Sequence, residues 1–241
     1  MNNNKYSTVF SNDFSSSEVS FIDYDIHAIE GDYSVVDAPL LTGKKAFKST
    51  LNINTAYYPT FQSGLPKCEL LPKVGASFFE FQKGKNYLIK LKTYLPENLQ
   101  VETYDNNGMT IFQIHQLEMY GSPIFALLID KNKVYVNQTT EKLPAGSETY
   151  RTFTQEICNL SDLLGAWTDW VIEYQADDFN KGYIQLLQNG KMVANIQHAN
   201  LYPGSLESYF VLGLYKWNLQ QQPTSCNYLE AFYTDVNILK I

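Results

Sequence analysis

The chain has few charged residues, and most of them are acidic. Only 18% of its 241 residues are charged, and 18 Lys and Arg stand against 25 Asp and Glu, which gives a formal net charge of −7. No run of lysine or arginine interrupts this composition. Domains that bind nucleic acid usually present a basic surface that releases counterions from phosphates. The composition therefore argues against DNA or RNA as a partner.

Long apolar runs and paired cysteines are also missing. No stretch approaches the roughly 20 apolar residues of a membrane-spanning helix, so we expect no membrane partner. The polar start, Met1–Thr8, lacks the pattern of a secretory signal. We expect a soluble protein, secreted or periplasmic if a leader is removed and otherwise cytoplasmic. The three cysteines form no Cys-x-x-Cys pair and are expected to be free thiols: Cys68, Cys158 and Cys226.

Aromatic residues and turn signals are abundant instead. The chain has 18 Tyr, 14 Phe and 3 Trp, and short apolar or alternating runs are split by turn clusters. The pair Asn189–Gly190 predicts a type I′ hairpin within residues 183–193. The one short helix is expected at 161–164. We predict an all-β fold over residues 1–241, a single jelly-roll sandwich of two curved antiparallel sheets of the concanavalin A-like kind, with 1–40 as a candidate peripheral segment.

Alternation along the predicted strand 109–117 separates a core face from an open face. Phe112 and Ile114 are apolar and suit the core. Gln113 and His115 then lie together on the open face, about 6.5–7 Å apart along the strand. Taken alone, a histidine at such a position is more often structural than catalytic.

Three further segments give similar assignments. In the strand that begins at Tyr209, alternation from Phe210 makes a core stripe and leaves Tyr209 and Tyr215 on the open face. Val211 and Gly213 share that face. Two lysine-containing pairs also share a strand face, and each is an ordinary surface feature when taken alone: Lys67 with Glu69, and Lys90 with Lys92.

The order of these segments is more specific than any one of them. Lys67–Leu70 (Lys-Cys-Glu-Leu), Gln113–His115 (Gln-Ile-His) and Tyr209–Tyr215 (Tyr-Phe-x-x-Gly-x-Tyr) follow one another along the chain. Together they resemble the three signature strands of the jelly-roll polysaccharide lyases, a superfamily that includes the alginate lyases, heparin lyase I and the glucuronan lyases. Other segments that resemble the heparin and glucuronan lyases extend the similarity over roughly residues 43–241: 43–47, 94–96, 165–171, 189–191 and 233–238.

The resemblance implies a lyase that cleaves a uronic-acid-containing polysaccharide by β-elimination, without a cofactor. The implied partner is an anionic polysaccharide or oligosaccharide. The resemblance implies no particular oligomeric state for the protein. In these roles, Gln113 and Lys67 would hold the uronate carboxylate, with His115 as the base and Tyr215 as the acid. Further substrate contacts are expected from six residues: Glu69, Lys90, Lys92, Tyr209, His198 and Lys216.

The sequence departs from these lyases at two motif positions. Lys67 stands where they usually carry Arg, which exchanges a planar, two-pronged group for a point charge. Val211 stands where their Tyr-Phe-Lys motif carries lysine. The cations that could replace that lysine are Lys216, Lys90 and Lys92. An acidic chain that binds a polyanion would have to gather these lysines with Lys67 at the cleft.

Other functions fit parts of the same pattern. A lectin-like relative would bind glycan through its aromatic residues without cleaving it, and a structural jelly roll would do neither. A glycoside hydrolase would need two carboxylates, whereas Glu69 stands alone on its strand. No catalytic metal is expected because the three histidines are far apart in sequence. The pair Asp177–Asp178, near Asn180, is a candidate for a structural calcium site.

Overall fold

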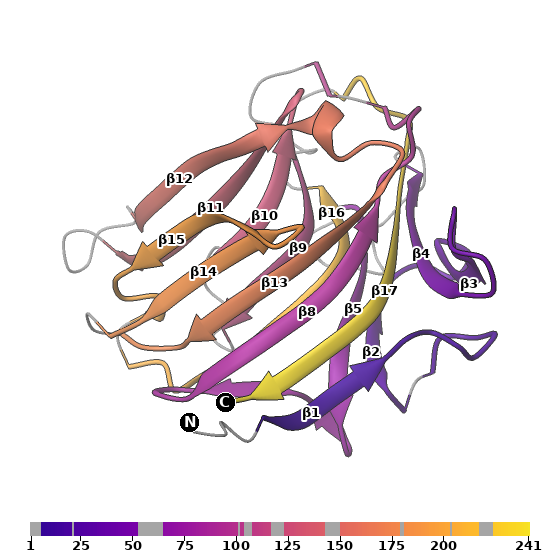
Figure 1. Ribbon diagram of the computed structural model, residues 1–241. Helices are drawn as coiled ribbons and strands as arrows, with labels where there is room; N and C mark the ends of the chain where they lie inside the picture. The colour runs from indigo at the N-terminus through magenta and orange to yellow at the C-terminus, as the bar shows by residue number, and fades with distance from the viewer. Residues whose placement is uncertain are drawn as a thin grey trace.

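Two antiparallel sheets face each other in the computed structural model of the chain (Figure 1). The structure describes residues 6–20, 22–52, 65–100, 102–103, 108–116, 123–142, 150–178, 181–202, 204–216 and 224–241. We call the two layers the front sheet and the rear sheet, after their places in Figure 1. The predicted all-β jelly-roll sandwich is confirmed.

The front sheet has the strand order β15-β14-β13-β8-β17-β4-β3, and β1 also pairs with β17. Its strands are β1 (Ser7–Asn12), β3 (Tyr33–Asp37), β4 (Lys45–Asn52), β8 (Asn86–Tyr94), β13 (Trp167–Gln175), β14 (Tyr183–Gln188), β15 (Lys191–Gln197) and β17 (Tyr228–Lys240).

The rear sheet has the order β12-β11-β10-β9-β16-β5-β2, with β6 on β5 and β7 on β16. Its strands are β2 (Tyr24–His27), β5 (Lys67–Val74), β6 (Ser77–Phe78), β7 (Glu80–Gln82), β9 (Met109–Gln116), β10 (Phe125–Asp130), β11 (Lys133–Lys142), β12 (Tyr150–Asn159) and β16 (Glu207–Lys216).

Aromatic residues fill the space between the sheets. Trp170 of β13 lies edge-on to Phe112 of β9, with ring centroids 5.8 Å apart. The Trp170 indole donates a hydrogen bond to the Thr93 hydroxyl, and the Tyr233 hydroxyl donates one to the backbone carbonyl of Ile111. Buried aromatic residues with polar ends are stable when those ends are hydrogen-bonded. Much of the aromatic surplus therefore serves the core.

The local predictions hold closely. Asn189 and Gly190 have φ values of +50° and +78°, which places the type I′ hairpin between β14 and β15. The short helix is a 3₁₀ turn, Leu160–Asp162, which begins one residue and ends two residues earlier than expected. The three cysteines are free thiols. In the described part of the chain, no helix is long and apolar enough to cross a membrane.

The described residues before residue 40, 6–20 and 22–39, contribute strands to both sheets and are not peripheral. β1 pairs with β17 in the front sheet, and β2 pairs with β5 in the rear sheet. Phe10 and Phe14 are buried in the core between them. The sequence missed these strands because they are short and alternate weakly, so they lack a clear periodic signal.

Candidate functional site

A pocket of about 460 Å³ lies on the face of the rear sheet that points away from the core. Strands β2, β5, β9, β10, β11 and β16 all contribute to its lining. The alternation predicted for β9 and β16 is confirmed for these residues, since Phe112 and Phe210 are buried in the core while Gln113, Tyr209 and Val211 line the pocket. Among the sequence-predicted residues, six line it: Lys67, Glu69, Gln113, His115, Tyr209 and Tyr215.

Strand β16 runs through the middle of the pocket, and its pairing with β9 and β5 determines which pocket residues lie opposite one another. Tyr209 is the cross-strand partner of His115 on β9, and Tyr215 is the partner of Lys67 on β5. Gly213, between them, has φ +131°, and a Cβ atom there would lie 2.2 Å from the Cys68 carbonyl oxygen. Only glycine allows β16 to approach β5 this closely.

Glu69 of β5 and Gln113 of β9, the two strands on either side of β16, are joined by a hydrogen bond. The Gln113 Nε2 donates a hydrogen bond to Glu69 Oε1 at 2.7 Å, and both side chains are buried. Burial raises the pKa of Glu69 to about 7, while Lys67 and the hydrogen bond from Gln113 act in the opposite direction. From the sequence we expected Glu69 to contact the substrate. Its hydrogen bond to Gln113 could not be predicted from the sequence.

His115 is held by its neighbours on two sides. Its Nδ1 lies 3.0 Å from the backbone carbonyl oxygen of Gln116, and its ring stacks on Tyr209 with centroids 5.7 Å apart. A carbonyl oxygen only accepts, so Nδ1 carries the proton and the lone pair lies on Nε2. In this tautomer Nε2 is the ring nitrogen that can accept a proton.

The two pocket tyrosines of β16, Tyr209 and Tyr215, have raised pKa values. Burial, together with the negative charge of Glu69, raises the pKa of Tyr209 and of Tyr215 to about 12. Each phenol is therefore protonated near neutral pH and is available as a hydrogen-bond donor or a general acid.

A second histidine, His27 of β2, also lines the pocket and was not predicted. It is the cross-strand partner of Glu69, and its Nε2 lies 3.4 Å from the Asp25 carboxylate. Burial and the nearby charge of Lys67 lower its pKa, although Asp25 opposes the change. The four-residue strand around His27 has too little alternation to assign a face from sequence.

A family model described as polysaccharide lyase matches residues 6–233, nearly the whole chain. The chain belongs to the polysaccharide lyase family. By sequence alone, no curated protein matches this family member.

Solved structures of similar fold support the same architecture for this lyase-family chain. An endo-β-1,4-glucuronan lyase from the fungus Trichoderma reesei superposes with TM-score 0.75 at 19% identity, covering 96% of this chain and 95% of the fungal one. An alginate lyase from Chlorella virus gives 0.60 at 12% identity, covering 98% and 100%. An endo-1,3-β-glucanase from Streptomyces sioyaensis gives 0.62 at 10%, covering 99% and 97%. At these identities the superpositions show a shared fold, which hosts both lyases and hydrolases.

Four of the expected substrate contacts lie away from the pocket of this family member. Lys90 and Lys92 are on β8 of the front sheet, and Lys92 contacts Asp169 at 3.2 Å. His198 follows β15, where its Nδ1 lies 2.9 Å from the Ala199 carbonyl oxygen. The expectation that lysines gather at the cleft is thus corrected, because Lys67 lines the pocket and Lys90, Lys92 and Lys216 do not. Alternation assigns a strand face but does not say to which sheet the strand belongs.

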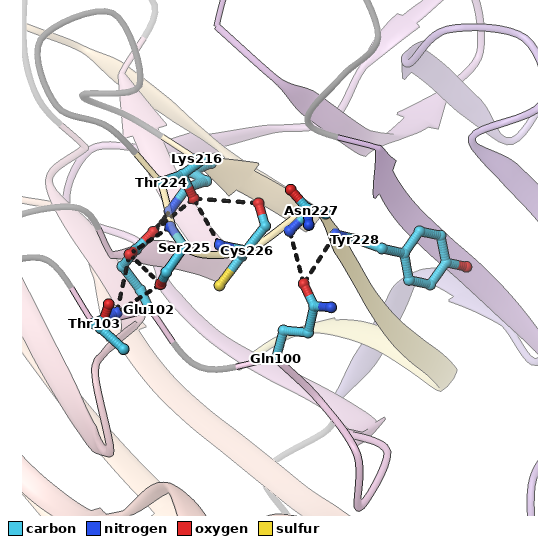
Figure 2. Close-up of polar contacts among 9 residues, drawn as sticks. All are labelled: Gln100, Glu102, Thr103, Lys216, Thr224, Ser225, Cys226, Asn227 and Tyr228. Carbon is cyan, nitrogen blue, oxygen red and sulfur yellow. Dashed lines mark hydrogen bonds and ion pairs between the residues drawn. The ribbon is translucent and has the colours of Figure 1, made fainter.

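Lys216, the last residue of β16, is buried, and Figure 2 shows the polar residues around it. It follows Tyr215 directly, so alternation sends its side chain away from the pocket. Its ammonium lies 2.9 Å from Glu102 Oε2, and Glu102 also accepts hydrogen bonds from the hydroxyls of Thr224 and Ser225. Although burial raises the pKa of Glu102, these hydrogen bonds outweigh it and hold the pKa well below its usual range.

Asp178, one of the residues of the candidate calcium site, is paired with a lysine. The Asp178 carboxylate pairs with the Lys83 ammonium and accepts the backbone N–H of Gly204. Asn180 lies outside the described residues. Within the described ranges, no group of three or more His, Cys, Asp or Glu side chains is arranged to hold a metal ion.

Proposed function

We propose that this protein cleaves a uronic-acid-containing polysaccharide by β-elimination. The observation that supports the proposal is that one pocket, in a member of the polysaccharide lyase family, is lined by the four residues to which we assign the roles of base, acid and carboxylate-binding groups. These are His115, Tyr215, Gln113 and Lys67.

The first chemical requirement is to neutralise the uronate carboxylate. The proton to be removed is on C5, next to that carboxylate, and its loss places negative charge on the carboxylate oxygens. Donors aimed at those oxygens stabilise the enolate-like transition state. Lys67 supplies a positive charge from β5, and Gln113 supplies an amide from β9.

The second requirement is a base beside the bound carboxylate. His115 lies two residues from Gln113 on the same strand face, and its tautomer places the lone pair on Nε2. Nε2 takes the C5 proton as the C4–C5 double bond forms. His27 is the other pocket histidine, but its Nε2 already faces the Asp25 carboxylate.

The third requirement is an acid for the leaving group. As the C4–O bond breaks, the glycosidic oxygen gains negative charge and takes the Tyr215 phenolic proton. The products are an unsaturated uronate at one new end and a hydroxyl at the other. The enzyme returns to its starting state when the proton on His115 is lost to water and Tyr215 regains one.

We expect this chain to release unsaturated uronate from at least one polyuronate. The panel is polyglucuronate, alginate and heparin, read by the rise in ultraviolet absorbance of the new double bond. Polyglucuronate is the first polymer to test, because the fungal structure with TM-score 0.75 is a glucuronan lyase. Retention on a polysaccharide gel with no absorbance from any polymer would contradict the proposal and favour a non-catalytic, lectin-like relative.

Val211 offers a test of the missing motif lysine. It lines the pocket beside Gln113, its cross-strand partner, and is only 3% exposed. We expect Val211→Lys to lower KM for the cleaved polymer by on the order of tenfold, because a charge about 8 Å from a carboxylate contributes about 2 kcal/mol at an effective dielectric of about 20. Val211→Met is the control of similar length. An equal fall in KM with Met, or a rise with Lys alone, would show that charge at this position is not limiting.

A further inference from the structure

Glu69 places a carboxylate in a pocket that is proposed to bind carboxylates. Among the lining residues in the described part of the chain, Glu69 is the one acidic side chain. It lies two residues from Lys67 on the same strand. When ionised, Glu69 adds a negative charge to the pocket and repels an anionic sugar. A proton on Glu69 removes that charge.

The hydrogen bonding of Gln113 points to the same carboxylate. Gln113 Nε2 donates to Glu69 Oε1 at 2.7 Å, as an ionised, acceptor-only carboxylate requires. The other amide atom, Gln113 Oε1, is buried and has no hydrogen-bond partner among the described residues. An ionised Glu69 thus takes one of the two amide N–H groups that the uronate needs and leaves the amide oxygen unsatisfied.

A neutral Glu69 reverses this arrangement. Its hydroxyl donates to Gln113 Oε1 once the amide has rotated by a half turn. The amide oxygen then has a partner, and the Nε2 hydrogens are turned away from Glu69. The change needs no backbone movement, because the two side chains already meet across β16 beside Gly213.

We propose, on the basis of the proposed function, that Glu69 is a proton-controlled positioning residue, which in its neutral form turns the Gln113 amide N–H groups towards the uronate carboxylate. Uronate binding and proton uptake at Glu69 are then coupled, and each favours the other to the same extent. The ionised form of Glu69 is the weak-binding form of the pocket.

Several other titratable groups surround Glu69, so its titration has to be separated from theirs. Burial raises the pKa of Glu69 to about 7, within the range where activity would be measured. The pKa of His27 is lowered by burial and by Lys67. The titratable groups that share the pocket lining with Glu69 are Lys67 on β5, His27 on β2, Tyr209 and Tyr215 on β16 and His115 on β9, and two more interact with its charge from the core side, Cys68 on β5 and Tyr233 on β17.

The first test is binding of a saturated glucuronate oligosaccharide to the full chain carrying His115→Ala, which is expected to slow cleavage enough for binding to be measured. Titration calorimetry at pH 6 and pH 8 is expected to show about tenfold weaker binding at pH 8, because a group of pKa about 7 loses its proton over this interval. With Glu69→Gln added, a permanently neutral amide, Kd should change less than about twofold. The same pH dependence in both chains, or none in the parent, would overturn the proposal.

The second test needs no ligand, so it separates failure of this proposal from failure of the lyase function. In the wild-type chain, the Glu69 carboxyl carbon and the Gln113 side-chain amide should shift in NMR spectra with one common midpoint near neutral pH. In Glu69→Gln the Gln113 shift should disappear. A Glu69 carboxyl that titrates below pH 5, or a Gln113 shift that persists in Glu69→Gln, would refute the coupling even if every polyuronate is cleaved.

Discussion

His115→Ala is expected to reduce kcat for elimination by about 10²–10⁴-fold, the usual contribution of a positioned general base. Tyr215→Phe should have a loss of similar size, because it removes the proton needed by the leaving oxygen. Both side chains are on the pocket face, so the midpoint of thermal unfolding should change by only a few degrees. Initial rates of absorbance increase on the polymer that is cleaved best provide the measurement.

His27→Ala and Tyr209→Phe are the matched controls for these two variants. Each removes the same kind of group from the lining of the same pocket. We expect each to keep kcat within about tenfold of the wild type, because neither group is assigned a proton transfer. If His27→Ala abolished elimination and His115→Ala did not, the base would have to be reassigned to β2.

Lys216→Met should destabilise the fold by about 3 kcal/mol, the lower part of the range for removing one partner of a buried ion pair. Lys216 is 1% exposed, and its ammonium lies on a Glu102 carboxylate that remains buried after the substitution (Figure 2). The hydrogen bonds from Thr224 and Ser225 remain and limit the loss. Denaturant unfolding at pH 7 measures the effect, with the exposed Lys90→Met as the control.

The pH dependence of this loss has a defined sign. Because the folded-state pKa of Glu102 lies below its ordinary value of 4.5, its contribution is present above pH 4.5 and is lost as the pH falls through the folded-state value. The difference between Lys216→Met and the wild type should therefore shrink in acid. A difference that stays constant down to pH 3, or a variant as stable as Lys90→Met at pH 7, would contradict a stabilising role for the pair.

Alternation predicted the faces of the two central pocket strands well. Phe112 and Phe210 point to the core, and Gln113 and Tyr215 to the pocket, because half-buried strands have a side-chain period of two. The Asn189–Gly190 turn was also predictable, since its positive φ angles favour that residue pair. These features depend on residues close in sequence.

Features that depend on distant residues were not predictable. Lys90 has a clear outward face, but membership of β8 in the front sheet follows from its pairing with β13 and β17. His27 comes into the pocket because β2 pairs with β5. Glu102 carries no local signal for burial, since its partner Lys216 is more than a hundred residues away. A single sequence does not contain the pairing information that fixes these positions.

The pairing of β1 with β17 also constrains the order in which the protein can assemble during synthesis. Ser7 is the cross-strand partner of Lys240, and β17 lies between β8 and β4 (Figure 1). Until β17 emerges from the ribosome, the front sheet lacks an inner strand and β8 has an unpaired edge, which invites pairing with other chains. Contacts between residues that are so far apart in the sequence form slowly. Folding of the front sheet is thus expected to be a late event that depends on the synthesis of β17, which follows β16 of the rear sheet along the chain.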